Sequence, residues 1–213
     1  MKRFVNWLAS KLDPPRVIYD REGGSPYLSR FYVFGSPKAN DGKPVFDKTG
    51  NPRPGIEWND RVGPVGVYLH KFHRSDDDQD THSHPWLWSI AIILSGGYSE
   101  ERRVPLGSLS KKESIGWAVS CMNWVLRNKD RFQTVQTRHA VIRRKFRPIS
   151  VNFIRGSDFH RVDLLSDESW SLFIAGPRVS GWSFWNRFTG EETPWREFIA
   201  RKRGQKVDEV KVS

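Results

Sequence analysis

The chain has 213 residues, enough for one sizeable core but few for two full domains, so we expect a single domain. Lys and Arg number 35 against 24 Asp and Glu, and the resulting charge of +11 favours phosphate-bearing partners or acidic substrates. The only cysteine, Cys121, excludes an internal disulfide, and no apolar run approaches the ~18 residues of a membrane span. We therefore expect a cytoplasmic protein with no membrane partner.

The first predicted element is a short amphipathic helix. We interpret it as a helix docked on the domain rather than one lying on a membrane surface. After it, residues 13–64 carry paired turn signals such as "GSPKANDGKP" around short β-prone pieces. Residues 1–64 are therefore predicted to be an N-terminal arm with loop-rich hairpins packed on the outside of the core. The apolar residues at helical spacing are Phe4, Val5, Leu8 and Leu12.

From residue 65 the sequence takes on the character of a core. It contains "VGVYLHKF" and, after an acidic turn, "THSHPWLWSIAIILSGGY", which predicts one long strand or two before a Gly-Gly break. The next segment, "SKKESIGWAVSCMNWVLRNKD", fits neither helical nor strand periodicity, and its structure stays open. Two further strands are predicted in "RPISVNFIRGSDFHRVDLL" and "SWSLFIAG", so the domain is mainly β. Residues 181–213 form a Trp-rich extension with a short helix after Pro194 and a basic tail.

Positive charge is concentrated in two clusters. Such runs are usually solvated faces, so nucleic-acid binding through them is the minor alternative. The first cluster consists of Arg127, Lys129, Arg131, Arg138, Arg143, Arg144, Lys145 and Arg147, and the second is "RKRGQK" at residues 201–206.

Histidines mark the candidate site. In "DTHSHPW", His82 and His84 are two apart, so on a strand they point to the same face and can present two imidazoles to one ion. By itself such a pair is more often a surface or turn feature. His70 and His73 are three apart and face opposite sides of a strand, so at most one of them can reach the same site. His139, within a basic stretch, is interpreted as a solvated histidine.

Aromatic and basic residues near these histidines are candidates for substrate binding. Regular alternation places Trp86 and Trp88 on the face of the histidine pair, where they form the aromatic wall of a cavity or simply pack in the core. Arg155 and Arg161 flank a later histidine, His160, and a guanidinium can pair bidentately with a carboxylate or phosphate. On a regular strand Arg161 faces away from His160, and it is equally well explained as a surface ion-pair partner.

Two motifs resemble the cupin superfamily. "HSHPWLWSIAIILSGGYSEE" is similar to its first motif, in which H-x-H opens a strand that ends in a glycine turn, and "IRGSDFHRVDLL" resembles the second. The two motifs lie between residues 82 and 165 of the chain. This resemblance implies a cupin-like double-stranded β-helix, a jelly-roll barrel over residues 65–180 with short peripheral helices. It also implies a metal in the barrel mouth, with His82, His84 and His160 as ligands.

One position departs from the cupin pattern. The family has a glutamate four or five residues after the second histidine, where this chain has Trp88 and Ser89. Three alternatives follow. The site has three histidines, as in the thiol dioxygenase branch; a carboxylate such as Glu100 or Asp80 substitutes from elsewhere; or the site binds no metal.

The resemblance implies a mononuclear metal-dependent cupin, with a non-heme iron dioxygenase acting on a small anionic substrate as the leading interpretation. The divalent metal is then Fe(II), with Zn, Mn or Ni as alternatives. The competing interpretation is a non-catalytic binding module or sensor whose basic surface contacts nucleic acid or a phosphorylated partner. The oligomeric state stays open, a homodimer being one option. Kinases, serine hydrolases and zinc fingers are disfavoured because their motifs are missing from the sequence.

Overall fold

A computed structural model describes most of the chain. Within the segment whose structure the sequence left open, residues 111–116 are helical. Cys121 and three members of the first basic cluster, Arg127, Lys129 and Arg131, lie outside the described residues, as do residues 203–206 of the second. The described residues are 1–19, 24–34, 37–39, 42–55, 64–76, 80–116, 118, 122 and 138–202.

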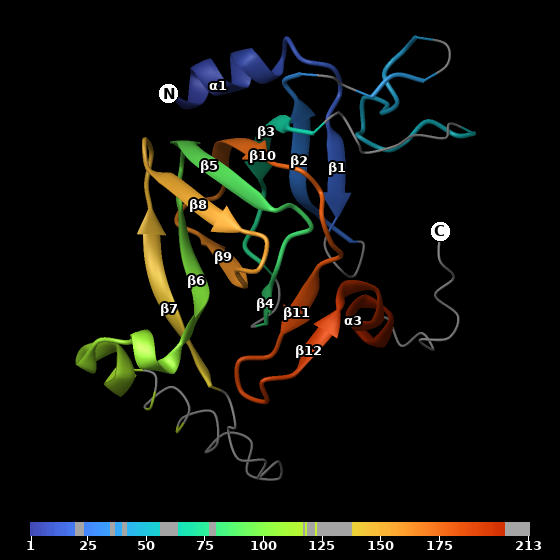
Figure 1. The fold of residues 1–213 in the computed structure, drawn as a ribbon. Coiled ribbons are helices and arrows are strands. Elements are labelled where there is room, and N and C mark those ends of the chain that lie inside the picture. Colours follow the sequence, from blue (N-terminus) through green and yellow to red (C-terminus); the bar gives the residue numbers. More distant parts are fainter. Residues whose placement is uncertain are drawn as a thin grey trace.

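The strands of the described residues form two six-stranded antiparallel sheets (Figure 1). Sheet I runs in the order β1 (Arg16–Tyr19), β2 (Pro26–Tyr32), β3 (Gly66–Phe72), β10 (Ser169–Ala175), β5 (Trp88–Ser95), β8 (Val151–Arg155). Sheet II runs in the order β12 (Glu192–Pro194), β11 (Ser183–Trp185), β4 (Thr81–His82), β9 (His160–Leu164), β6 (Tyr98–Pro105), β7 (His139–Phe146). The described helices are α1 (Lys2–Ala9), α3 (Trp195–Lys202) and the 3-10 helix η1 (Leu106–Ser108), together with the helical residues 111–116.

The strand order is that of a jelly roll. Strands β3 to β10 contribute β3-β10-β5-β8 to sheet I and β4-β9-β6-β7 to sheet II, and every neighbouring pair is antiparallel. The first of these eight strands therefore pairs with the last, and the second with the seventh, as in two interlocked Greek keys. This order confirms the mainly β, cupin-like jelly roll that the sequence predicts.

The segments on either side of these eight strands extend the sheets. β2 pairs with β3 and β1 with β2, so the N-terminal hairpin lengthens sheet I (Figure 1). At the other end of the chain β11 pairs with β4 and β12 with β11, which lengthens sheet II. Residues before 65 and after 180 thus share backbone hydrogen bonds with the barrel as well as side-chain contacts.

The core lies between the two sheets, and five of the eleven residues in its buried cluster are aromatic. Strand β5 shows the alternation that builds it, because Ala91 and Ile93 are buried inside while Ile90 and Ile92 lie on the other face. The β5 strand ends at Gly96 and Gly97, whose φ angles of 77° and 123° favour glycine. The buried cluster contains Tyr32, Ala39, Val45, Phe46, Tyr68, Ala91, Ile93, Tyr98, Val162, Phe173 and Ala175.

Helix α1 packs on the outer face of sheet I. Val5 and Ala9 are buried against Leu69 and Trp170, in agreement with the docked amphipathic helix that the sequence predicts. Phe4 differs from that prediction, because its side chain is 60% exposed and lies outside the packed face. Across the described part of the chain, no helix combines the length and the apolar character needed to cross a membrane.

Candidate metal centre

The structure brings together the three histidines that the sequence predicts as ligands. His82 ends β4, His84 follows it by two residues, and His160 opens β9 as the cross-strand partner of His82. Their candidate ligand nitrogens all lie within 4.8 Å of one another. Among the described residues this is the only group of three or more His, Cys, Asp or Glu side chains with such spacing. We call it the histidine cluster.

Two of the imidazoles converge on one point. Nε2 of His84 lies 2.7 Å from Nε2 of His160, and the three ring centroids are 4.8 to 5.3 Å apart. Burial holds the pKa of His84 well below its usual value, and the neighbouring His160, His82 and Arg30 lower it further. His84 is therefore neutral near pH 7, which is the form that donates a lone pair to a metal ion.

Each of the other two histidines has a carboxylate behind it. Nδ1 of His160 lies 2.6 Å from Oε1 of Glu100, so its proton is donated to the carboxylate and Nε2 keeps its lone pair. Nδ1 of His82 lies 3.9 Å from Oδ2 of Asp76, which is too far for a hydrogen bond. The carboxylate of Glu100 therefore sets the tautomer and the ring orientation of His160, whereas Asp76 does not do so for His82.

Glu100 is fully buried and firmly held. Arg102 pairs with it at 2.8 Å, and the side-chain amide of Asn152 donates to Oε1 at 2.9 Å and to the hydroxyl of Tyr98 at 3.1 Å. Burial raises the pKa of Glu100, but the hydrogen bonds from His160 and Asn152 and the charge of Arg102 outweigh it and lower the pKa to about 2. Glu100 is therefore a permanent anion at the back of the histidine cluster.

This donor set fits a first-row divalent metal. Three imidazoles, one of them held by a buried carboxylate, suit Fe, Zn, Mn or Ni, and three protein ligands leave positions open. Of the alternatives for the missing cupin glutamate, the three-histidine set agrees with the geometry. Glu100 contacts His160 rather than entering the histidine cluster, and Asp80 lies in a separate cavity.

A buried cation lies inside the barrel near the histidine cluster. Arg30 on β2 is only 7% exposed, and its Nε donates to Nε2 of His70 at 3.2 Å. The Arg30 guanidinium carbon lies 5.0 Å from the ring centre of Tyr68 and 5.6 Å from that of Trp86, and Trp86 stacks on His84 at 5.4 Å. A chain of aromatic contacts therefore connects this cation to the histidines.

The two predicted tryptophans lie on opposite sides of sheet I. Trp86 packs against the core beside the histidine cluster, whereas Trp88 packs on the outer side against Gly176, where an added Cβ would lie 2.6 Å from its ring. Ser89, paired with Ala175 of the core, takes the inner position instead. Alternation from the histidines does not reach Trp88, because β5 begins anew after the bend that follows Pro85.

Neither predicted substrate-binding arginine points into the barrel. Arg155 is exposed on the outer face of sheet I, as the cross-strand partner of Trp88. Arg161 lies on the outer face of sheet II, where it pairs with Asp163 at 2.7 Å and with Glu101 at 3.5 Å. Arg161 thus faces away from His160, as expected for a regular strand. Arg30, unlike Arg155 and Arg161, has its guanidinium inside the barrel.

Of the other histidines considered from the sequence, His70 faces the interior and stacks on Phe173 at 4.5 Å. His73 bonds Ser29 at 2.8 Å. His139 lies in β7, near Trp185. None of these three belongs to the histidine cluster.

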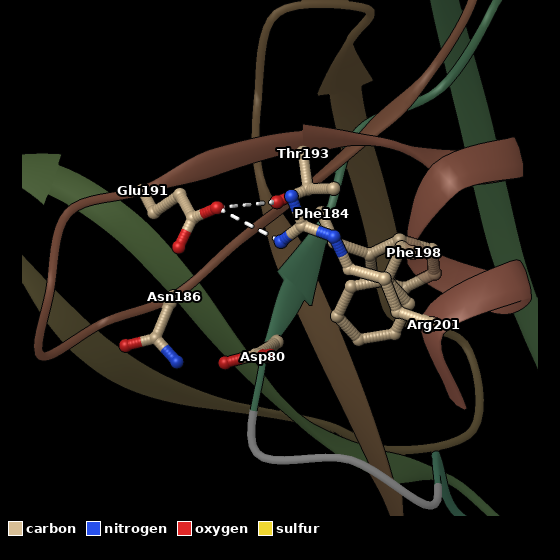
Figure 2. Close-up of a pocket in the computed structure, with 7 residues that line it drawn as sticks. All are labelled: Asp80, Phe184, Asn186, Glu191, Thr193, Phe198 and Arg201. Atoms are coloured by element: carbon tan, nitrogen blue, oxygen red, sulfur yellow. Dashed lines mark hydrogen bonds and ion pairs between the residues drawn. The ribbon is translucent and has the colours of Figure 1, made fainter. Parts of the chain in front are cut away.

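A cavity of about 760 Å³ lies beside strand β11. Figure 2 shows the rings of Phe184 and Phe198 together with Arg201 on one side of it and Asp80, Asn186 and Glu191 on the other. Phe184 is the cross-strand partner of His82, so it separates this cavity from the histidine cluster. Arg201 is already engaged there, at 3.1 Å from Glu191. The lining residues are Asp80, Phe184, Asn186, Glu191, Thr193, Phe198 and Arg201.

Sequence reasoning missed Arg30, Arg102 and Asn152. A signal existed for Arg102, because it lies two residues after Glu100 on the same strand and therefore shares its face. Arg30, in "YLSRFY", occupies an inward position of an alternating strand, but sequence alone did not identify that face as the inner one. Asn152 carried no signal.

No protein-family model matches the sequence, and no curated protein matches it. The solved structures that are similar include an oxalate oxidase in complex with glycolate, at 11% identity and a TM-score of 0.36, with 73% of this chain and 53% of that chain covered. This chain thus spans about half the length of the oxalate oxidase.

Two further solved structures are similar at the same level. KdgF from Halomonas sp. is 12% identical with a TM-score of 0.34, covering 71% of this chain and 80% of that one. A cupin superfamily protein from Desulfitobacterium hafniense is 11% identical with a TM-score of 0.29, covering 57% and 72%. These values are too low to transfer an activity from any of these proteins to this chain.

Proposed function

We propose that this chain is a mononuclear metal-dependent cupin that acts as a non-heme iron dioxygenase on a small anionic substrate. The observation that carries the proposal is the histidine cluster itself, in which three imidazoles converge without a carboxylate while Glu100 stands behind His160. A divalent iron bound by three neutral ligands would keep its full charge and offer open positions to substrate and dioxygen.

The barrel interior supports an anionic substrate. Arg30 places a buried positive charge on the same side of the barrel as Trp86 and His84, and this charge contributes to the low pKa of His84. In such apolar surroundings a guanidinium attracts a carboxylate more strongly than it would in water. Arg30 is therefore the group we assign to the anionic end of the substrate.

The remaining residues position and shield the site. Glu100 accepts the Nδ1 proton of His160 and so keeps Nε2 of that histidine directed at the cluster centre. Trp86 and Phe173, 5.5 Å apart, provide an apolar wall beside His84 that excludes water from one side.

Metal content tests the proposal. Protein purified without a histidine tag is stripped and reconstituted with Fe, Mn, Ni and Zn in turn, and oxygen uptake is then recorded with a panel of small carboxylates and thiol carboxylates. We expect close to one iron per chain and iron-dependent oxygen uptake with at least one anion. Less than about a tenth of an equivalent of every metal would exclude the enzyme.

We propose as the second candidate a non-catalytic binding module that uses its basic edge. Strand β7 is an edge of sheet II and exposes Arg143, Arg144 and Lys145, of which Arg143 is ion-paired with Glu101 at 2.5 Å. Binding of duplex or single-stranded nucleic acid at ~50 mM salt that weakens steeply with added salt would favour this candidate. No binding under these conditions would dismiss it.

A further inference from the structure

Exposed apolar side chains gather on one part of the outer face of sheet I. On helix α1, Phe4 and Trp7 are 60% and 56% exposed, and their stacked rings have centroids 5.9 Å apart. At the start of β8, Ile149, Val151 and Phe153 are exposed by 78%, 60% and 50%. We refer to these five residues as the α1–β8 surface.

The two halves of this surface meet at one end of β5. Helix α1 packs over Leu94, and the backbone N–H of Ile149 donates to the carbonyl of Ile93 at 2.8 Å. In Figure 1, α1 lies over the end of β5. His82 and His84 precede the other end of β5, so the α1–β8 surface lies away from the histidine cluster.

The exposure of these side chains is not required by the fold. The packed side of α1 is formed by Val5 and Ala9, whereas Phe4 and Trp7 leave more than half of their surface in solvent. Ile149 has a φ of 75°, a left-handed conformation that β-branched residues avoid. The chain therefore accepts backbone strain at a turn that presents an isoleucine to solvent.

Positive charges surround the apolar residues. Arg3 on α1 and Arg147 in the turn before Ile149 are both exposed. Pairing this face with that of a second copy would bring arginines together in a chain whose charge is already +11. A negatively charged partner is attracted by the same arginines.

We propose that the α1–β8 surface binds the anionic face of a lipid bilayer. Trp7, Phe4 and Ile149 enter the boundary between headgroups and acyl chains, and the arginines contact lipid phosphates. The sequence alone favoured a docked helix without a membrane partner, but α1 is docked by one side and presents aromatic rings on another. Membrane-bound protein would keep the barrel mouth turned to water.

Vesicle co-sedimentation of the full chain tests this proposal. Vesicles of phosphatidylcholine with about 30% phosphatidylserine are compared with pure phosphatidylcholine at about 0.1 M salt. We expect binding to the anionic vesicles, and at least about tenfold weaker binding to the neutral ones or in about 1 M salt. Equal binding to both vesicle types, or binding to neither, overturns the proposal.

Matched variants locate the surface. Trp7→Ser combined with Ile149→Asn should reduce binding about tenfold or more, and Asn tolerates the positive φ, so the fold is retained and its melting temperature verifies this. Leu87→Ser and Val179→Ser are controls, because these side chains are 55% and 59% exposed near Pro85, at the other end of β5. Unchanged binding by the double variant overturns the proposal. The proposal is also overturned if light scattering shows that the unmodified protein is a dimer, the double variant is a monomer, and neither protein binds vesicles.

Discussion

Strand β6 buries one ionised glutamate on its inner face and another on its outer face. Only the inner glutamate, Glu100, contacts the histidine cluster. Glu100 contacts His160, Arg102 and Asn152 inside the barrel. On the outer face of the same strand, the neighbouring Glu101 lies 2.5 Å from both Arg143 and Arg187 and 3.5 Å from Arg161. Because their partners differ, Glu100 orients a histidine of the cluster, whereas Glu101 joins neighbouring strands through arginines.

Both glutamates have strongly lowered pKa values for the same physical reason. Burial raises the pKa of each, but hydrogen bonds and nearby positive charges outweigh it and bring each pKa to about 2. For Glu100 these are the hydrogen bond from His160 and the charge of Arg102, and for Glu101 the hydrogen bonds and charges of Arg187 and Arg143. A perturbed pKa therefore does not identify the functional residue here. The contacts of each carboxylate identify its role instead. Glu100 contacts an imidazole of the histidine cluster, whereas Glu101 contacts arginines that join strands on the outer face.

The largest expected effect concerns the inner face and the metal. His84→Ala removes one of three ligands, so we expect the bound metal to fall from close to one equivalent to less than about a tenth. His139→Ala is the matched control, because His139 lies on β7 outside the histidine cluster and its loss should leave the metal content unchanged. Elemental analysis of both variants after reconstitution measures the difference. Retention of metal by His84→Ala would show that the ion binds elsewhere.

The two glutamates can be separated by paired substitutions. Glu100→Gln keeps the shape but removes the charge that orients His160, so metal affinity should fall about ten- to a hundredfold. Glu101→Gln should leave the affinity unchanged, because Glu101 contacts the arginines of the outer face. Competition with a chelator of known affinity measures both variants. An equal loss in the two variants would mean that the effect is on the fold, and the distinction between the faces would fail.

The fold and the positions of the three histidines are predictable from the sequence, but the side-chain orientation in β5 is not. Strand periodicity predicts a mainly β domain and places His82 and His84 on one face. The jelly roll and the third ligand, His160, are implied by the resemblance of the two motifs to the cupin superfamily. The strand periodicity does not extend across the bend after Pro85. There the phase of alternation is reset, so Ser89 rather than Trp88 faces inwards.

Contacts between distant strands are the part that sequence does not supply. Glu100 is sixty positions from His160, and only the pairing of β6 with β9 brings them within 2.6 Å. Arg30 reaches the interior because β2 joins sheet I, which composition and turn signals did not predict. Its location depends on a tertiary pairing, so no local pattern around Arg30 could have indicated that it lies near the site.

A smaller effect is expected on stability in acid. The pKa of Glu101 is about 2 in the folded chain against an ordinary 4.5, so its stabilisation is complete above about pH 4.5 and is lost as the pH falls towards 2. Glu101→Gln should therefore lower the free energy of unfolding by about 2 kcal/mol at pH 7 and have little effect near pH 2. Urea unfolding of the metal-free proteins at several pH values measures this difference. A difference that does not change with pH would contradict the assignment.

The smallest effect separates the partners of Glu101 on the outer face. The Arg143 side chain is 58% exposed, so water and salt already screen its charge, and Arg143→Ala should cost less than about 1 kcal/mol. The Arg187 side chain is 11% exposed, and its removal leaves a buried carboxylate short of a partner, so Arg187→Ala should cost more, about 2 kcal/mol. Urea unfolding at pH 7 in low and high salt measures both variants. Salt should reduce the small effect of Arg143→Ala further and leave that of Arg187→Ala nearly unchanged, because screening acts on exposed charges. Equal costs for the two variants would mean that burial does not decide the strength of these ion pairs.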